Sequence, residues 1–244
     1  MHALVRAITA SLALAGCTAP GPVTAPDEQP PASQTPVQPP APEPSPPPAA
    51  PIDVAKLSGY VLSREASRDI PPRFTAVVAA IDGASGEGMG TWRLALTDTA
   101  TNTTHEIKIQ APAALAPPLR PGDRITARVR PTGGGPNMRH AMVFTADDGP
   151  LLAINEPPDN FKVSRGPAGD VDRGPDYVER SYGVTFEHAG VRVSVAAGAW
   201  ARMTIGEAVY YVWGSGAQRR LRPGKRPMPD YVGAWLDFAI VRVR

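Results

Sequence analysis

The stretch TWRLALTD at residues 91–98 decides the fold class of this chain. Every second side chain in it is large and apolar, namely Trp92, Leu94 and Leu96, and the side chains between them are polar or small. A period of two with one apolar face is typical of a half-buried β-strand. The stretch therefore predicts β structure, and the segments on both sides of it repeat the signal.

Five neighbouring segments also have the composition of strands. They are short apolar or alternating runs at 74–82, 105–112, 120–130, 140–149 and, as a sixth strand, 150–156. Turn signals separate them: a glycine-rich stretch at 83–90, the polar run TATNTT at 99–104 and Pro-Gly-Asp at 121–123. Strands this closely spaced predict an all-β domain at residues 53–156.

This arrangement resembles an OB-like small barrel. The likeness rests on about five strands, a glycine-rich loop after the first and a Pro-Gly-Asp entry to the fourth. A β-sandwich would give the same pattern, so both architectures stay open. The segment APAALAPPL at 111–119 stands where such a barrel often keeps a helix, but its prolines argue against one.

Residues 157–179 interrupt the strand pattern, and we predict a connecting loop there. Residues 157–176 are rich in proline and glycine and have no apolar period. Their aspartates are spaced loosely like a calcium loop, but Pro175 stands where that loop needs glycine. A solvated acidic loop is therefore the favoured interpretation.

Residues 180–244 return to β structure, either as a second β domain or as the second half of the same fold. The run at 182–198 predicts a hairpin turning at Ala189-Gly190. EAVYYVWG at 207–214 is apolar on both faces, which predicts a central strand covered on both sides. The apolar run at 233–244 predicts a closing strand.

The chain begins with a short apolar run that ends in Leu14-Ala15-Gly16-Cys17. This tetrad resembles the lipobox of bacterial lipoproteins. The resemblance implies that residues 1–16 are a signal peptide, that Cys17 carries the lipid and that the membrane is a partner through this anchor. Thr18 follows the cysteine, and a residue other than aspartate there favours the outer membrane.

Residues 17–52 are predicted to be a disordered tether. Fourteen of residues 18–52 are proline, and no apolar period is present. Such a segment cannot bury enough apolar surface to offset the entropy lost on ordering. It would hold a folded domain away from the bilayer.

One stretch is a candidate binding site. GSGAQRRLRPGKRP at 214–227 places arginines directly after aromatic residues. The candidates are Tyr211, Trp213, Arg219, Arg220 and Arg222. Aromatic and guanidinium groups together suit an anionic glycan, peptidoglycan or an envelope protein, and nucleic acid is not expected. The alternative is an exposed hairpin that pairs with the acidic loop of the same chain.

No pattern of catalytic residues is recognisable. His105, His140 and His188 each lack a second histidine or cysteine at ligand spacing, so no metal or cofactor is expected. The sequence therefore predicts a non-enzymatic binding or assembly module in the cell envelope. The alternative is a cell-wall or glycan hydrolase, or its accessory domain, using a carboxylate pair that sequence cannot identify.

Overall fold

In the computed structural model the chain folds into β-sheet, which confirms the predicted all-β class. The structure describes residues 51–85, 88–132, 139–172, 177–221, 224 and 234–243. The predicted signal peptide, Cys17 and all but the last two residues of the predicted tether lie outside them. Among the described residues, no helix has both the length and the apolar character needed to span a membrane.

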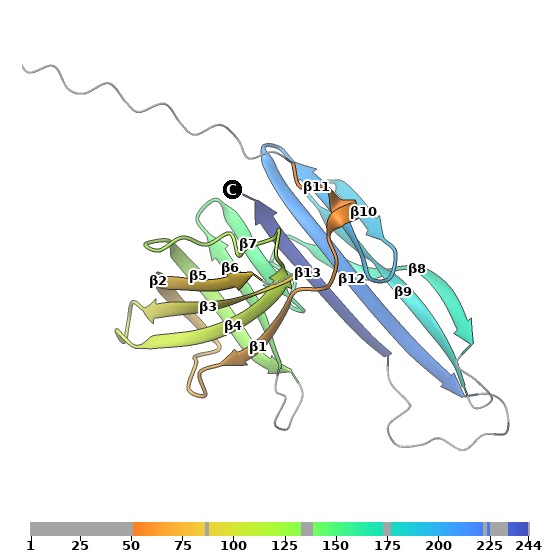
Figure 1. Ribbon diagram of the computed structural model, residues 1–244, viewed down its shortest axis with the longest axis horizontal. Helices are drawn as coiled ribbons and strands as arrows, with labels where there is room; N and C mark the ends of the chain where they lie inside the picture. Colours follow the sequence, from red (N-terminus) through yellow and green to blue (C-terminus); the bar gives the residue numbers. More distant parts are fainter. Residues whose placement is uncertain are drawn as a thin grey trace, which may run out of the picture. The chain divides into compact units, whose positions relative to one another are not determined.

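Six strands form a closed antiparallel barrel (Figure 1). They are β1 (Leu62–Ala66), β2 (Arg73–Ser85), β3 (Met89–Asp98), β4 (Thr104–Pro112), β5 (Arg124–Thr132) and β6 (Arg139–Ala146). Their order is β1-β4-β3-β2-β5-β6, and β6 closes the ring on β1, where His140 lies opposite Ser63. Of the two predicted architectures the barrel is present, with six strands instead of about five.

Among the six barrel strands, the one that the sequence analysis did not predict is β1. It is five residues long, and a bulge between Ser63 and Glu65 interrupts its alternation. The predicted sixth strand forms as β7 (Gly149–Ile154), which pairs with β6 but lies outside the closed ring. A strand from before the first predicted strand therefore completes the barrel.

The barrel interior is filled as the alternation predicts. Leu94 and Leu96 are fully buried, and Trp92 is nearly so. Trp92 lies opposite Ile109 and Leu94 opposite Ile107, both buried in the same core. These cross-strand pairs stabilise the barrel by removing apolar area from water, at about 25 cal/mol per Å².

The glycine-rich stretch at 83–90 is mostly strand and not loop, because β2 runs to Ser85 and β3 begins at Met89. The ring of Trp92 lies across the backbone of both Gly83 and Gly90, where any Cβ would collide with it. The glycines there make room for a tryptophan.

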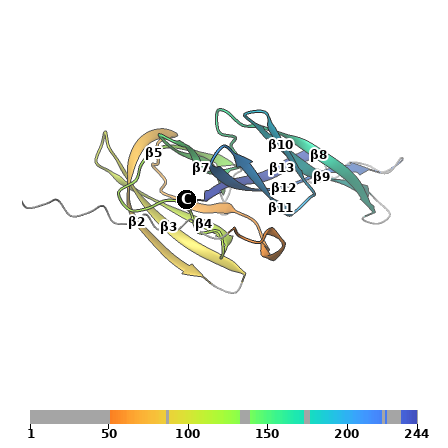
Figure 2. The ribbon, with the colours of Figure 1, turned by 90° about the horizontal axis from the view of Figure 1, so that it is seen from above.

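A second group of strands, here called the outer sheet, continues from β7. It comprises β8 (Lys162–Asp172), β9 (Tyr177–His188), β10 (Val191–Val195), β11 (Ala199–Ile205), β12 (Ala208–Leu221) and β13 (Ala234–Val243). β7 pairs with β6 on one side and with β13 on the other. Figure 2 shows barrel strands β2–β5 on one side of β7 and the outer sheet on the other.

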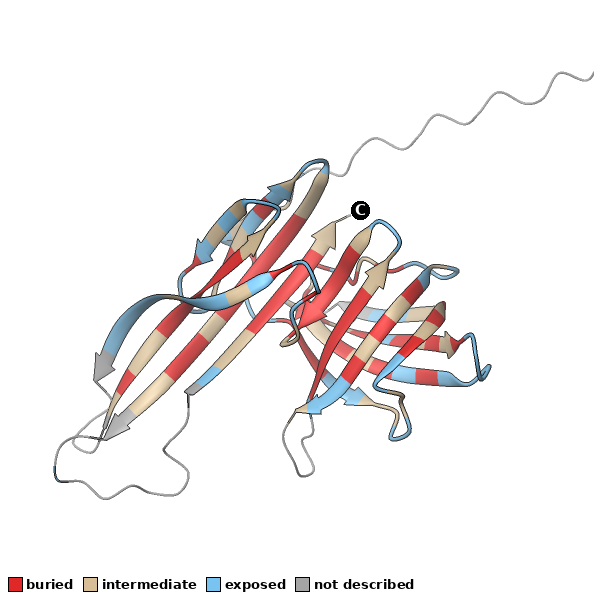
Figure 3. Cartoon of the chain, turned by 180° about the vertical axis from the view of Figure 1, so that it is seen from behind, coloured by how far each residue is buried: buried red, intermediate tan, exposed pale blue. Residues whose placement is uncertain are grey.

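The outer sheet has its own apolar core. Its fully buried members include Val184, Phe186, Val212 and Ile240. Buried residues run along the middle of β9, β12 and β13 in Figure 3. Barrel and outer sheet belong to one hydrogen-bonded sheet of thirteen strands.

The predicted connecting loop at 157–179 is wrong in its middle, which is strand β8, and at its end, where β9 begins at Tyr177. β8 pairs antiparallel with β9, and its register shifts between Arg165 and Ala168. This irregularity lies at Gly166-Pro167, and together with many exposed side chains it hides the period from the sequence. The predicted turn at Ala189-Gly190 is confirmed: both residues have positive φ, 48° and 79°, as a two-residue type I′ hairpin requires.

The segment before β1 joins the barrel to the outer sheet. The Tyr211 hydroxyl accepts a hydrogen bond from the Ile52 N–H at 2.8 Å and donates to the Ile52 carbonyl at 3.1 Å. The Trp200 indole N–H donates to the Gly59 carbonyl at 3.0 Å. The folded part of the chain therefore includes Ile52, one residue before the predicted boundary at 53.

Candidate functional site

Of the two aromatic residues predicted to bind a partner, Tyr211 is structural, and Trp213 is largely buried but lines a pocket described below. Tyr211 keeps 1% of its surface exposed, and its hydroxyl is occupied by Ile52. The indole N–H of Trp213, which is also buried, donates to the Gly198 carbonyl at 2.9 Å. β12 is covered on both faces here, as its apolar sequence predicted, so Tyr211 is not available at the surface.

Of the three predicted binding arginines, the structure describes the side chain of Arg219 alone. Arg219 Nε donates to Glu179 Oε2 at 3.3 Å, and its guanidinium carbon lies 5.5 Å from the centre of the Trp235 ring. Arg219 thus pairs with the acidic end of the 157–179 segment, as the alternative interpretation predicted. Arg220 belongs to β12 but its side chain is not described, and Arg222 lies outside the described residues.

One face of β12 and β13 continues from the barrel core toward Arg219. We call it the barrel-side face, and its residues alternate along β12 and β13: Trp213, Ser215, Ala217, Arg219, Trp235 and Asp237. Trp213 packs in the barrel core, Ser215 lies opposite Asp237, and Ala217 lies opposite Trp235. Trp235 is 42% exposed, an unusual state for so large an apolar side chain.

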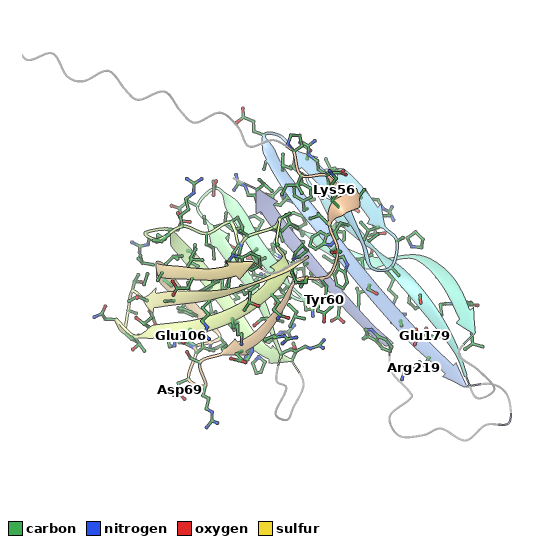
Figure 4. All side chains as sticks on the ribbon, in the orientation of Figure 1. Lys56, Tyr60, Asp69, Glu106, Glu179 and Arg219 are labelled. Carbon is green, nitrogen blue, oxygen red and sulfur yellow. The ribbon has the colours of Figure 1, made fainter. Side chains whose placement is uncertain are left out.

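A pocket of about 220 Å³ lies where the barrel meets the barrel-side face. Its walls come from segments far apart in the sequence: Tyr60 and Ser63, Arg139 and His140, Ile154 and Asn155, and Trp213, Ser215 and Asp237. Figure 4 shows Tyr60 at this junction and the Glu179–Arg219 pair farther along the outer sheet. The pocket and the exposed Trp235 therefore share one face of the molecule.

Two buried polar atoms on residues that line the pocket have no hydrogen-bond partner among the described residues, and each exposes less than 1 Å² of surface, so neither is open to the pocket. They are Ser63 Oγ and His140 Nδ1, on residues that are 1% and 6% exposed. Ser63 and His140 lie directly opposite each other where β1 and β6 close the barrel. Burial lowers the pKa of His140, so its imidazole is neutral at pH 7.

Asn155 fixes the far wall of the pocket. It has a positive φ of 53°, which turns the chain away from β13 at the end of β7. Its side-chain Nδ2 donates to Asp237 Oδ1 at 2.8 Å, and its Oδ1 accepts from the Phe238 N–H at 2.7 Å. The amide holds the Asp237 carboxylate at the pocket wall.

The pocket contains serine, histidine and aspartate, but their arrangement is not that of a nucleophilic triad. Such a triad needs a hydrogen bond from the serine to the histidine and another from the histidine to the acid. Ser63 Oγ and His140 Nδ1 lack partners, and Asp237 is bonded to Asn155. The arrangement offers a ligand one aromatic wall at Tyr60 and two charged groups, Arg139 and Asp237.

The other two histidines serve the packing. His105 lies edge-on to Phe74, with ring centres 5.2 Å apart. His188 stacks on Phe161 at 4.3 Å, and its Nδ1 lies 2.8 Å from the Asn160 carbonyl oxygen. In the described part of the chain no three His, Cys, Asp or Glu residues gather as a metal site.

Comparisons with models of protein families, with curated proteins and with solved structures find no match to this chain. Sequence reasoning missed the pocket because its walls meet only in the fold. The one local signal is His140, which the sequence presents as an isolated histidine.

Proposed function

We propose that this chain is a lipid-anchored envelope protein whose β unit binds a partner and catalyses no reaction. The Leu14–Cys17 tetrad supports the anchor, and Thr18 supports an outer-membrane destination. The partner classes that fit are an anionic glycan, peptidoglycan or another envelope protein. The proposed binding function rests on one structural observation.

That observation is the continuity of the pocket with the barrel-side face. The Asp237 carboxylate is held at the pocket wall by Asn155, and Trp235 on the same face of β12 and β13 is exposed over 42% of its surface. Concave, partly apolar sites with a few placed polar groups are the usual form of binding sites. The Arg219–Glu179 pair bounds this surface on the outer sheet.

Photo-crosslinking in intact cells tests the proposal. A photoreactive amino acid at Ser181 would lie on the barrel-side face, because Ser181 pairs directly with Ala217. The matched control is Glu207, exposed in the turn at the opposite end of β12. We expect a discrete crosslinked product from position 181 and not from 207. Equal crosslinking from both positions contradicts the proposal.

The anchor has its own test. Cys17→Ser should abolish incorporation of an alkyne fatty acid, because the thiol is the proposed attachment point. Equal labelling of wild type and variant would remove the lipoprotein half of the proposal. The binding half would remain testable by crosslinking.

The hydrolase alternative needs two carboxyl groups about 5–10 Å apart across a substrate. Only one carboxylate, Asp237, is among the residues that line the pocket, and it is held by Asn155. This is why we favour binding. Release of soluble fragments from purified peptidoglycan by the wild type, lost in Asp237→Asn, would reverse that preference.

A further inference from the structure

We propose that the edge of β13 at 234–237, left open where β7 ends, binds one extended segment of another envelope protein as an added strand. This inference rests on the proposed function and selects a protein segment from its three partner classes. Its starting point is the place where the sheet divides between the barrel and the outer sheet.

β7 covers only part of β13. It pairs with residues 239–241, whereas β12 pairs with β13 along its whole length. At Asn155 the chain turns away from β13. Within the described residues no strand pairs with 234–237 on the side opposite β12, which is the side toward the barrel in Figure 1. This stretch of β13 is therefore an open edge.

The backbone groups of Leu236 point to this edge. Phe238 uses both of its backbone groups on the β7 side: its N–H donates to Asn155 Oδ1, and its carbonyl accepts from the Asn155 N–H at 3.0 Å. In an antiparallel sheet the side to which the N–H and C=O of a residue point alternates along the strand. Leu236 and Ala234 therefore direct these groups to the same side as Phe238. Among the described residues nothing bonds to Leu236 there.

This edge lacks the features that protect the edge at β8. β8 carries Pro167 and a register shift, whereas β13 pairs with β12 without a shift across 234–237. The residues of this stretch, Ala-Trp-Leu-Asp, include no proline or lysine. Proteins normally blunt or cover an exposed edge, because its free backbone groups accept another strand. A regular open edge is the form of site that binds an extended peptide.

The edge selects a polypeptide, because a polypeptide presents N–H and C=O groups at the spacing of a strand. Arg139 of the barrel and Asp237 of β13 line the same pocket of about 220 Å³, so the barrel lies within one pocket's width of the edge. A single strand needs only about 4.8 Å beside β13. A second copy would bring its own β12 and barrel into that space.

The N-terminal segment of this chain is a poor occupant. Fourteen of residues 18–52 are proline, and proline has no N–H to donate to a neighbouring strand. The added strand is therefore assigned to another protein.

Two exposed aromatic side chains lie beside the path of the added strand. Side chains alternate between the faces of a sheet, so the residues opposite Trp235 and Asp237 lie on the barrel-side face. The first would pack against Trp235, and the second would enter the pocket that Tyr60 lines. Aromatic and β-branched residues form favourable pairs across strands. We therefore expect apolar residues two positions apart in the bound segment.

A phage-displayed library of random nine-residue peptides, selected against the full chain purified in detergent, tests the inference. The most enriched peptide is synthesised in three forms: unmodified, and with N-methyl groups on alternate residues in either register. We expect one methylated form to bind like the unmodified peptide and the other to bind at least about fivefold more weakly, because only one side of the strand bonds to β13. Equal binding of all three forms, or no enriched peptide, overturns the inference.

Leu236→Pro removes the N–H that faces the edge and that β12 does not use. It should weaken binding of the unmodified peptide by at least about fivefold, the equivalent of one lost hydrogen bond. The matched control is Leu236→Ala, which shortens the same side chain but keeps the N–H and should bind like the wild type. Equal binding by the two folded variants places the peptide elsewhere and overturns the inference.

Hydrogen exchange of the wild-type Leu236 amide, followed by NMR, needs no substitution. Exchange should be fast in the free protein and at least about fivefold slower with the unmodified peptide bound. Slow exchange without peptide would show that the edge is already covered. Slow exchange that appears only as the protein dimerises would assign the edge to a second copy. Either result overturns the inference.

Crosslinking from Ser181 in intact cells distinguishes this failure from failure of the proposed function. A discrete crosslinked product that persists in Leu236→Pro, together with no peptide binding, leaves the binding module standing with another partner. Absence of the product in the wild type removes both.

Discussion

The barrel and the outer sheet are held together in different ways. The barrel is closed, so each of its six strands has neighbours on both sides. Within the described strands, β8 of the outer sheet pairs only with β9 and so forms an edge. That edge carries Pro167 and a register shift, two features that discourage pairing with another chain.

Side chains show the same contrast. The barrel is filled by apolar pairs such as Leu94 and Ile107. Toward their far ends β8, β9 and β12 are joined by polar pairs: Arg180 with Asp170 at 2.6 Å, and the Tyr182 hydroxyl donating to Gln218 at 2.8 Å. Closure thus gives the barrel its stability, and the long strands of the outer sheet give the molecule a surface that extends beyond the barrel.

The largest expected loss of stability follows a substitution in the outer sheet, at Gly183. A Cβ there would collide with the carbonyl oxygen of Val195, a backbone atom that cannot rotate away. Gly183→Ala should lower the free energy of unfolding by about 3 kcal/mol or more, as measured by urea denaturation. In the barrel the obstacle at Gly90 is the Trp92 side chain, so Gly90→Ala should cost less, about 1–2 kcal/mol.

The control for this pair is Gly169→Ala on β8, where a Cβ meets nothing within 4 Å. It should change the free energy of unfolding by less than about 0.5 kcal/mol. If Gly183→Ala and Gly169→Ala behave alike, close packing does not limit the outer sheet.

The junction between the two regions comes next. Tyr211→Phe removes a buried hydroxyl that holds both backbone groups of Ile52. We expect a loss of about 1–3 kcal/mol in the free energy of unfolding, because the Ile52 groups lose their partner. Tyr182→Phe is the matched control, since the Tyr182 hydroxyl donates to the side chain of Gln218, whereas that of Tyr211 holds two backbone groups. A larger loss in the control would show that the junction does not depend on Tyr211.

A smaller effect should depend on pH. Burial lowers the pKa of His140 in the folded barrel below the ordinary value of 6.5. Below pH 6.5 the unfolded chain therefore binds a proton more readily than the folded one, and stability falls as pH drops toward the folded pKa. Above pH 6.5 this contribution to stability is complete.

Urea denaturation at pH 5.5 and pH 7.5 measures this difference. His140→Gln should reduce the loss at pH 5.5, and His188→Gln in the outer sheet should retain the dependence due to His140. A wild-type midpoint that does not fall at the lower pH would contradict the lowered pKa.

The smallest expected effect is at Arg219. The side chain of Arg219 is 31% exposed and that of Glu179 is 10% exposed, so the pair is only partly screened. Glutamine at position 219 keeps an N–H donor for the Glu179 carboxylate, and the charge that is lost is worth about 1 kcal/mol or less where solvent still reaches the pair. Arg219→Gln should therefore lower the free energy of unfolding by less than about 1 kcal/mol, and the difference should shrink in high salt. Arg202→Gln, at an exposed position on β11, should change stability less still. A loss above that of Tyr211→Phe would make the Glu179 pair a main support of the outer sheet.

Sequence patterns within a single strand or turn predicted the elements whose conformation depends on residues adjacent in the chain. The alternation of Trp92, Leu94 and Leu96 gave a half-buried strand, and Ala189-Gly190 gave a turn because its geometry needs positive φ. β1, β8 and β11 escaped prediction. β1 is short and bulged, β8 is an irregular edge, and the buried side chains of β11, Trp200 and Met203, do not alternate with a period of two. Their pairing partners, and not their own periods, make them strands.

The site could be predicted far less well. Two predictions from the sequence were incompatible: that β12 is covered on both faces, and that Tyr211 on β12 binds a partner. Tyr211 is buried, so the first prediction is correct. The pocket brings Ser63, His140 and Asp237 together from three separate strands. No local spacing records such a meeting, because it depends on how the barrel closes and how β13 pairs with β7.

The bond between Tyr211 and Ile52 also has a mechanical consequence. Tension applied through residues 1–50 enters the fold at Ile52 and is resisted first by one tyrosine hydroxyl on the outer sheet. Behind that contact the segment is held again, by the buried side chain of Leu57 and by the hydrogen bond from the Trp200 indole to the Gly59 carbonyl. The load then reaches Tyr60 at the wall of the pocket. A pull on the N-terminal segment would therefore have to break these contacts in series before it reached β1.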